Sequence, residues 1–242
     1  MCGSPTRESA TRKSTFLGAY PNGGYKAVPV LRVDMNAREF VDTVRDRNET
    51  ALSRLGSSKS LYADTGGEME PETVLAAAAD AEHAAAETFE AWAETADEDA
   101  AAVFAETADE ERDHYEQVAA ELDDHEPSDV VPAIQTYLRD LDDTVERLGG
   151  LVGRTLAAEK SKEQTTGFFV GQAKPTTASL FRELGGDLDG QLDRATALLA
   201  ERCETDEDWN RALEAADAAI QTAYEEYTER LESMGVNPKP VC

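Results

Sequence analysis

A pattern of acidic residues and a histidine, spread over two consecutive helical segments, constrains the fold of this chain more than any other feature. Glu82 lies in the segment LAAAADAEHAAAETFEAW, and Glu111 and His114 form a Glu-x-x-His motif in FAETADEERDHYEQVAAEL. In four-helix bundles that bind two metal ions through carboxylates, two helices each supply one glutamate and the other two each supply Glu-x-x-His. The three residues therefore match one half of such a site.

The same pattern returns 77 residues later in incomplete form. Glu159 occupies the position of the first glutamate, but Leu188 and Gln191 replace the second glutamate and the histidine. Four of the six expected ligands are therefore present. The candidate metal ligands are Glu82, Glu111, His114 and Glu159.

The helical phase of these residues supports a shared interior site. Glu82 and Glu111 lie on the apolar stripes of their helices, and His114 lies at the edge of its stripe. Ionised carboxylates on an apolar stripe are costly unless they are paired or bound to metal. His83 and His125 lie off these stripes or in a loop, so we expect both to be solvated.

Helical periodicity continues through almost the whole chain from Met35 onward, and no strand-like alternation occurs, so the predicted class is all-α. Asn36 is a predicted N-cap, and Gly149-Gly150 is expected to precede the third bundle helix. The pattern predicts an antiparallel four-helix bundle made of two helical hairpins, with extra helices at both ends that pack outside it. The predicted bundle helices run to about Thr95, over 99–122, to about Gly171, and over 176–202.

The domain organisation follows from composition and breaker residues. Residues 1–34 carry five basic and two acidic side chains and show no helical period. They predict a disordered basic extension, with a genuine flexible or targeting arm as the alternative. The rest divides into an N-terminal helix (35–68), the bundle (69–203), and a C-terminal helix with its tail (204–242).

Charge limits the partners of this chain. The net charge is −27, from 50 acidic and 23 basic residues, which argues against binding to nucleic acid or to an anionic membrane. Such a surface is typical of a salt-adapted cytoplasmic protein. Three widely separated cysteines favour a reducing compartment over a disulfide framework. The long amphipathic terminal helices would suit a homodimer.

The run from LAAAADAEHAAAETF through FAETADEERDHYEQV resembles the rubrerythrin branch of the ferritin-like superfamily, and the similarity extends over about 72–200. The resemblance implies non-haem iron and oxidoreductase chemistry on peroxide or oxygen. The three carboxylates and one imidazole of the candidate ligand set would suit one or two ions of iron, with manganese or zinc as alternatives. The resemblance also implies an external electron donor, because the rubredoxin-like tail of full-length members is missing. The alternative is a ferritin-like protein that binds no metal and serves as a structural or regulatory partner.

Lys162 offers a test between these alternatives. It follows Glu159 by about one helical turn, where its ammonium group could replace the second cation of the site. The other interpretation is that this lysine extends to solvent, as lysines usually do.

Overall fold

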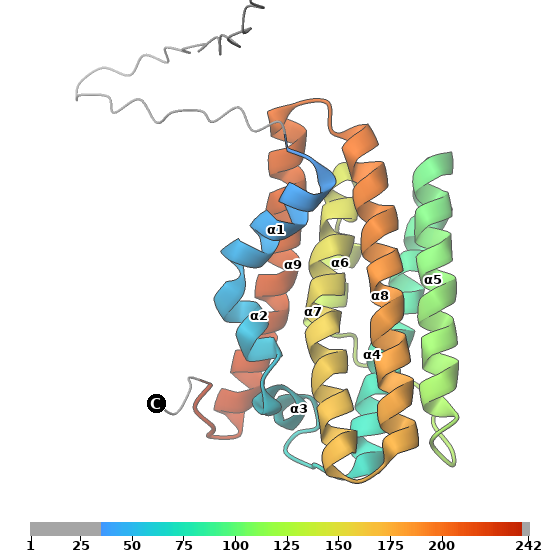
Figure 1. Cartoon of the computed structure of the whole chain (residues 1–242), viewed down its shortest axis with the longest axis vertical. Coiled ribbons are helices and arrows are strands. Elements are labelled where there is room, and N and C mark those ends of the chain that lie inside the picture. The colour runs from blue at the N-terminus through green and yellow to red at the C-terminus, as the bar shows by residue number, and fades with distance from the viewer. Residues whose placement is uncertain (1–34, 239–242) are drawn as a thin grey trace, which may run out of the picture. The chain divides into compact units, whose positions relative to one another are not determined.

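The computed structural model describes residues 35–238, and every regular element within that range is an α helix, which confirms the all-α class (Figure 1). The predictions for 1–34 lie outside the described residues. The helices are α1 (Ala37–Arg47), α2 (Glu49–Leu55), α3 (Ser58–Asp64), α4 (Pro71–Thr95), α5 (Glu98–Ala119), α6 (Ala133–Arg139), α7 (Thr144–Gly171), α8 (Pro175–Arg202) and α9 (Asp206–Ser233).

The predicted N-terminal helix is three short helices. Asn36 caps α1 as expected, in a capping box with Glu39. The chain then bends at Asn48, whose side-chain amide donates to the Val44 carbonyl (2.9 Å) and to Asp217 of α9 (2.6 Å). This side chain ties the bend to α9, so the first three helices follow the surface of α9 and α7 instead of forming one rod.

Two long helical hairpins, α4/α5 and α7/α8, pack side by side, and α9 packs against α7 on the side away from α5 (Figure 1). The bounds of the hairpin helices agree with the predicted helices to within a few residues, except that α7 begins at Thr144, ahead of the glycine pair that was expected to precede it. The hairpins meet where α5 packs beside α8, and the chain passes between them through α6. The helix α6 in this connection is short: it ends at Arg139, and Asp143 caps the start of α7.

The last helix packs along α7 at close range. A Cβ atom at Gly149 would lie 2.2 Å from the Ala212 carbonyl oxygen, and one at Gly153 would lie 2.4 Å from that of Ala216. The prediction that Gly149-Gly150 precedes a helix was wrong, because both glycines lie inside α7. The lack of a side chain at Gly149 and Gly153 allows the backbones of α7 and α9 to approach.

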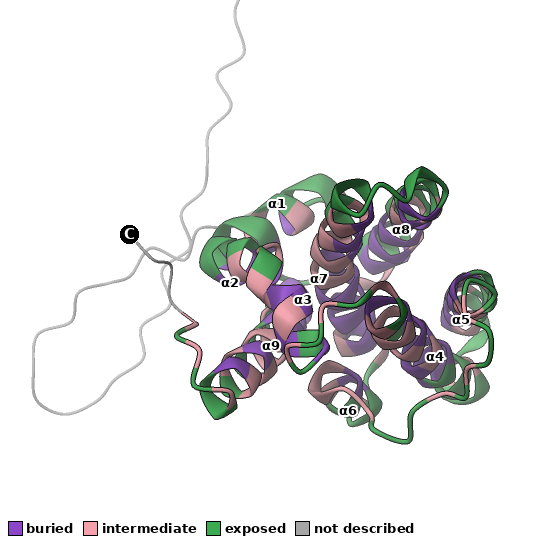
Figure 2. Cartoon of the chain, turned by 90° about the horizontal axis from the view of Figure 1, so that it is seen from below, coloured by how far each residue is buried: buried purple, intermediate pink, exposed green. Residues whose placement is uncertain are grey.

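A polar layer divides the core into two hydrophobic clusters. One cluster contains Phe89, Phe104 and Leu148 with much of α9, and the other contains Val74 and Phe181 at the opposite end of the hairpins. In Figure 2 the buried residues lie on the facing sides of the helices. On α4, α5 and α8, the residues between the two clusters are the ones that the sequence pattern singled out.

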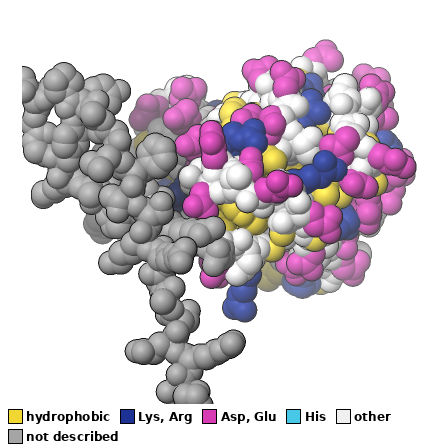
Figure 3. Space-filling model, turned by 90° about the horizontal axis from the view of Figure 1, so that it is seen from above, with side chains coloured by type: hydrophobic (Ala, Val, Ile, Leu, Met, Phe, Trp, Pro, Cys, Tyr) yellow, Lys and Arg dark blue, Asp and Glu magenta, His cyan; other side chains and the backbone are white. Residues whose placement is uncertain are grey.

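Acidic side chains cover much of the surface, as Figure 3 shows for one face. Several of the arginines on this surface are paired with acids, among them Arg194 with Glu110 and Arg202 with Asp97. No helix among residues 35–238 combines the length and the hydrophobicity needed to cross a membrane.

Candidate carboxylate and histidine site

The polar layer is built from side chains of all four hairpin helices at the same height. Glu82 comes from α4, Glu111 and His114 come from α5, and Gln191 comes from α8. Helix α7 adds two cations, Arg154 and Lys162. All six side chains are buried, with residue exposures of 5% or less.

Glu111 is fully buried and accepts three hydrogen bonds. Arg154 donates to both carboxylate oxygens, at 2.6 Å (Nη1 to Oε1) and 2.7 Å (Nη2 to Oε2). Gln191 Nε2 donates to Oε1 at 2.7 Å. The bidentate pair is the strongest geometry available to a carboxylate and a guanidinium. Burial opposes the charge of Arg154, but the Glu111 carboxylate outweighs this effect and raises the pKa of Arg154.

Glu82 pairs with the second cation. Lys162 Nζ donates to Glu82 Oε1 at 2.6 Å, and both side chains are 5% exposed. Lys162 is therefore buried beside Glu82, as the first interpretation expected, and the alternative in which it extends to solvent is wrong. Although burial opposes ionisation of Glu82, Lys162 and the other groups around it hold the pKa of that carboxyl well below its usual value.

His114 links the layer to the surface. Its Nε2 lies 3.2 Å from Oδ2 of the half-exposed Asp187, while its Nδ1 lies 3.9 Å from Glu82 Oε2 and 4.0 Å from Glu111 Oε2. Burial favours the neutral ring, but the facing Glu82 and Glu111 carboxylates outweigh it and raise the pKa of His114. A ring protonated on both nitrogens would donate toward an acid on each side.

The buried Glu82, Glu111 and His114 could hold a metal ion on distance alone, because one ligand atom from each lies within 4.8 Å of the others. Glu82 Oε2 and His114 Nδ1 also lack a hydrogen-bond partner. The electrostatics oppose an ion there. Arg154 Nη2 lies between the two carboxylates, 2.7 Å from Glu111 Oε2 and 3.7 Å from Glu82 Oε2. A pair of metal ions does not fit these residues, because two fixed cations already balance the two carboxylates.

Glu159 does not join the other three predicted ligands. Both of its carboxylate oxygens accept from Arg45 of α1 at 3.2 Å, on the side of α7 that faces away from the layer. Burial against α1 raises the pKa of Glu159, and the Arg45 charge opposes that rise. Of the four residues that were expected to converge, the structure brings together Glu82, Glu111 and His114 but not Glu159.

One further sequence interpretation needs correction, and one residue of the site was not predicted. His125 is not solvated: its side chain is 9% exposed, with Nε2 at 3.2 Å from Asp80. His83 is partly exposed, as expected, beside Glu87. The sequence reasoning also missed Arg154. The available signal was an arginine inside the otherwise apolar run LGGLVGRTLAA, since an arginine at such a position needs a buried acid.

Comparisons of the chain with protein-family models, with curated proteins and with solved structures give no match.

Proposed function

We propose that this chain is a ferritin-like protein of the rubrerythrin type that works without a resident metal centre, as a structural or regulatory binding protein. One observation carries the proposal: Arg154 and Lys162 neutralise the two carboxylates that would otherwise bind metal. The polar layer at one height of four helices, with Glu82 and a Glu-x-x-His motif in the expected places, supports the ferritin-like assignment.

Charge balance explains why metal is disfavoured. The two carboxylates and the two cations carry no net charge, and protonation of His114 is matched by Asp187. A divalent ion would add two positive charges to a buried, neutral group of side chains. Binding would also require the loss of the bidentate Arg154 pair and a neutral His114. Two of the six ligand positions, Leu188 and Gln191, carry no charge that could offset this cost.

A second candidate function is favoured by the two unpartnered atoms, Glu82 Oε2 and His114 Nδ1. They face the same gap as Glu111 Oε2. A single iron or other divalent ion in this gap would support an oxidoreductase acting on peroxide or oxygen, with an external electron donor. This candidate requires Arg154 to swing away from both carboxylates.

A titration with Co²⁺, followed by its ligand-field absorption, distinguishes the two candidates. We expect no site-bound Co²⁺ in the wild-type protein. Lys162→Glu removes a cation and adds a ligand, so this variant should gain a Co²⁺ spectrum. Lys160→Glu is the matched control, because Lys160 is a more exposed lysine on the same helix, paired with Glu163. Tight Co²⁺ binding by the wild-type protein that is abolished by His114→Ala would favour the second candidate.

A further inference from the structure

A cleft of about 590 Å³ lies between α4 and α7, on the side of the molecule where α3, α9 and the segment before α6 enclose it. It exists because small side chains line both of its long walls. These residues are Ala77, Ala78 and Ala81 on α4, and Ala157, Ala158 and Ser161 on α7. Its size falls within the range of cavities that bind small organic molecules.

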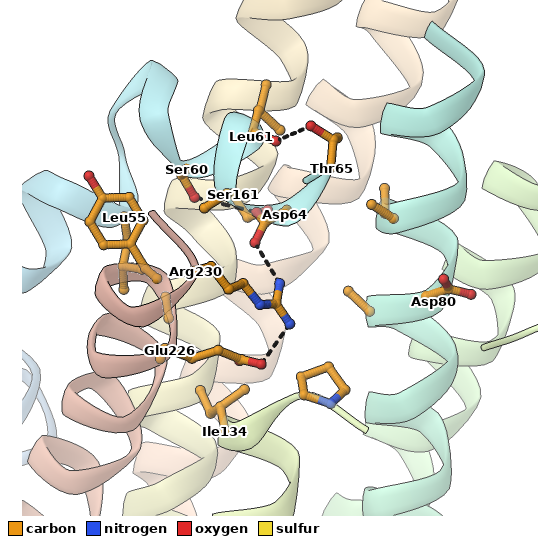
Figure 4. A pocket seen from close by; sticks show the side chains of 18 of the residues that line it. Leu55, Ser60, Leu61, Asp64, Thr65, Asp80, Ile134, Ser161, Glu226 and Arg230 are labelled. Atoms are coloured by element: carbon orange, nitrogen blue, oxygen red, sulfur yellow. Dashed lines mark hydrogen bonds and ion pairs between the residues drawn. The ribbon is translucent and has the colours of Figure 1, made fainter. Parts of the chain in front are cut away.

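The end of the cleft near α3 and α9 is formed by an ion-pair chain. Arg230 reaches from α9 toward α4 and contacts Glu226 (2.6 Å) and Asp64 (3.3 Å), as Figure 4 shows. Asp80 lies on the opposite wall. Arg230 is therefore already engaged by two acids.

The inner wall of the cleft reaches the polar layer. Glu82, Arg154 and Lys162 all line it, and both cations are bound to carboxylates of that layer. The charged residues that line the cleft include four acids and three bases. All three basic side chains at these lining positions are already paired with acids, so none is available to pair with a negatively charged ligand. Such a ligand would also approach a chain with a net charge of −27.

Two buried acceptors among the lining residues have no donor. Gln135 Oε1 and Glu82 Oε2 lack hydrogen-bond partners, and the two residues are 3% and 4% exposed. A buried acceptor without a donor loses free energy that a bound donor can restore. Apolar lining residues such as Val74, Ile134 and Phe181 would contact the rest of a ligand.

We propose that the cleft binds a small amphipathic molecule that has an apolar body and an uncharged or singly positive head group with hydrogen-bond donors. An amine or a hydroxyl group meets this description, and a carboxylate does not. The proposal goes beyond the metal question, because the cleft and the unpaired Gln135 Oε1, which is not part of the polar layer, do not depend on an ion. It also extends the proposed function, because it names the class of ligand that a regulatory binding protein of this kind would bind.

The test uses decylamine, decanol and decanoate, which share one chain and differ in the head group. Each probe is titrated against the full-length protein carrying Nile red, a neutral fluorescent dye, with and without EDTA. We expect decylamine and decanol to displace the dye and decanoate to bind at least about tenfold more weakly, since an unpaired buried charge costs more than 1.4 kcal/mol. Decanoate that binds as well as decylamine would overturn the assigned ligand class.

Two variants locate the site. Ala78→Trp fills the cleft and should abolish displacement, whereas Ala105→Trp, on the exposed face of α5, should not affect it. Gln135→Met keeps the volume but removes the acceptor, so it should weaken decanol binding about three- to tenfold while direct Nile red binding is unchanged. If Ala78→Trp lowers the melting temperature, Ala158→Phe serves as the second filling variant. Probe binding that is unchanged in both filling variants would show that the cleft is not the site. Because EDTA is varied separately, metal in the polar layer and ligand in the cleft give distinguishable results.

Discussion

Replacement of Arg154 by methionine tests the buried ion pair at the centre of the account. Methionine fills a similar space beside Phe89, over whose ring the guanidinium now lies at 5.6 Å, but it cannot pair with Glu111. Glu111 would keep only the hydrogen bond from Gln191. Removing one partner of a buried pair typically costs about 3 to 5 kcal/mol.

The cost of protonating an unpaired Glu111 has a similar magnitude. An unpaired buried glutamate can avoid the cost of its charge by taking up a proton, which at pH 7 costs about 3.7 kcal/mol for an ordinary carboxyl group. The loss in unfolding free energy for Arg154→Met should therefore be about 4 kcal/mol at pH 7. It should shrink by about 1.4 kcal/mol for each pH unit as the pH falls toward 5, because protonation becomes cheaper.

Urea denaturation at several pH values measures this loss. The double variant Arg154→Met/Glu111→Gln removes both charges and leaves an oxygen for Gln191, so it should be more stable than Arg154→Met alone. Arg45→Met, which removes the half-exposed partner of Glu159, is the control and should cost less than about 1 kcal/mol. A loss below about 1 kcal/mol for Arg154→Met, independent of pH, would refute the reasoning.

Two further predictions concern the same helices. Gly153→Ala would force a Cβ to within 2.4 Å of the Ala216 carbonyl oxygen, so the free energy of unfolding should fall by about 1 to 3 kcal/mol or more, and the melting temperature with it. Gly186→Ala, which has open space around it in α8, is the control and should be neutral or slightly stabilising. Equal effects of the two substitutions would contradict the close packing of α7 on α9. The raised pKa of His114 means that its interactions stabilise the fold most below about pH 6.5 and lose this effect as the pH rises through the folded-state pKa. The difference in unfolding free energy between wild type and His114→Gln should therefore decline with rising pH, and a difference that is constant with pH would contradict the assignment.

The sequence predicted the long helices and half of the site because those features depend on local periodicity. On α4 and α5, Glu82, Glu111 and His114 lie on or beside stripes that face the other hairpin, so their helical phase sufficed to bring them together. The same reasoning failed for α7. This helix is covered by α8 on one side and α9 on another, and its sequence alone does not show which apolar face meets which neighbour.

Glu159 illustrates that failure. Arg154, Ala158 and Lys162 follow one another at intervals of four residues along the cleft face of α7. Glu159 lies one residue beyond Ala158, which rotates it by about 100° toward α1 and Arg45. The alignment of the two repeat copies assumed that matching positions have the same phase in both hairpins. The close packing of α9 at Gly149 and Gly153, a contact distant in sequence, fixes the phase of α7 instead.

The metal content of the native protein tests the central claim most directly. The full-length chain would be purified without chelator from cells supplied with iron, and metals would be measured by mass spectrometry together with protein concentration. Because Arg154 and Lys162 already neutralise Glu111 and Glu82, the account predicts well below one ion of iron, manganese or zinc per chain. One or two equivalents of iron per chain that disappear in His114→Ala would contradict it.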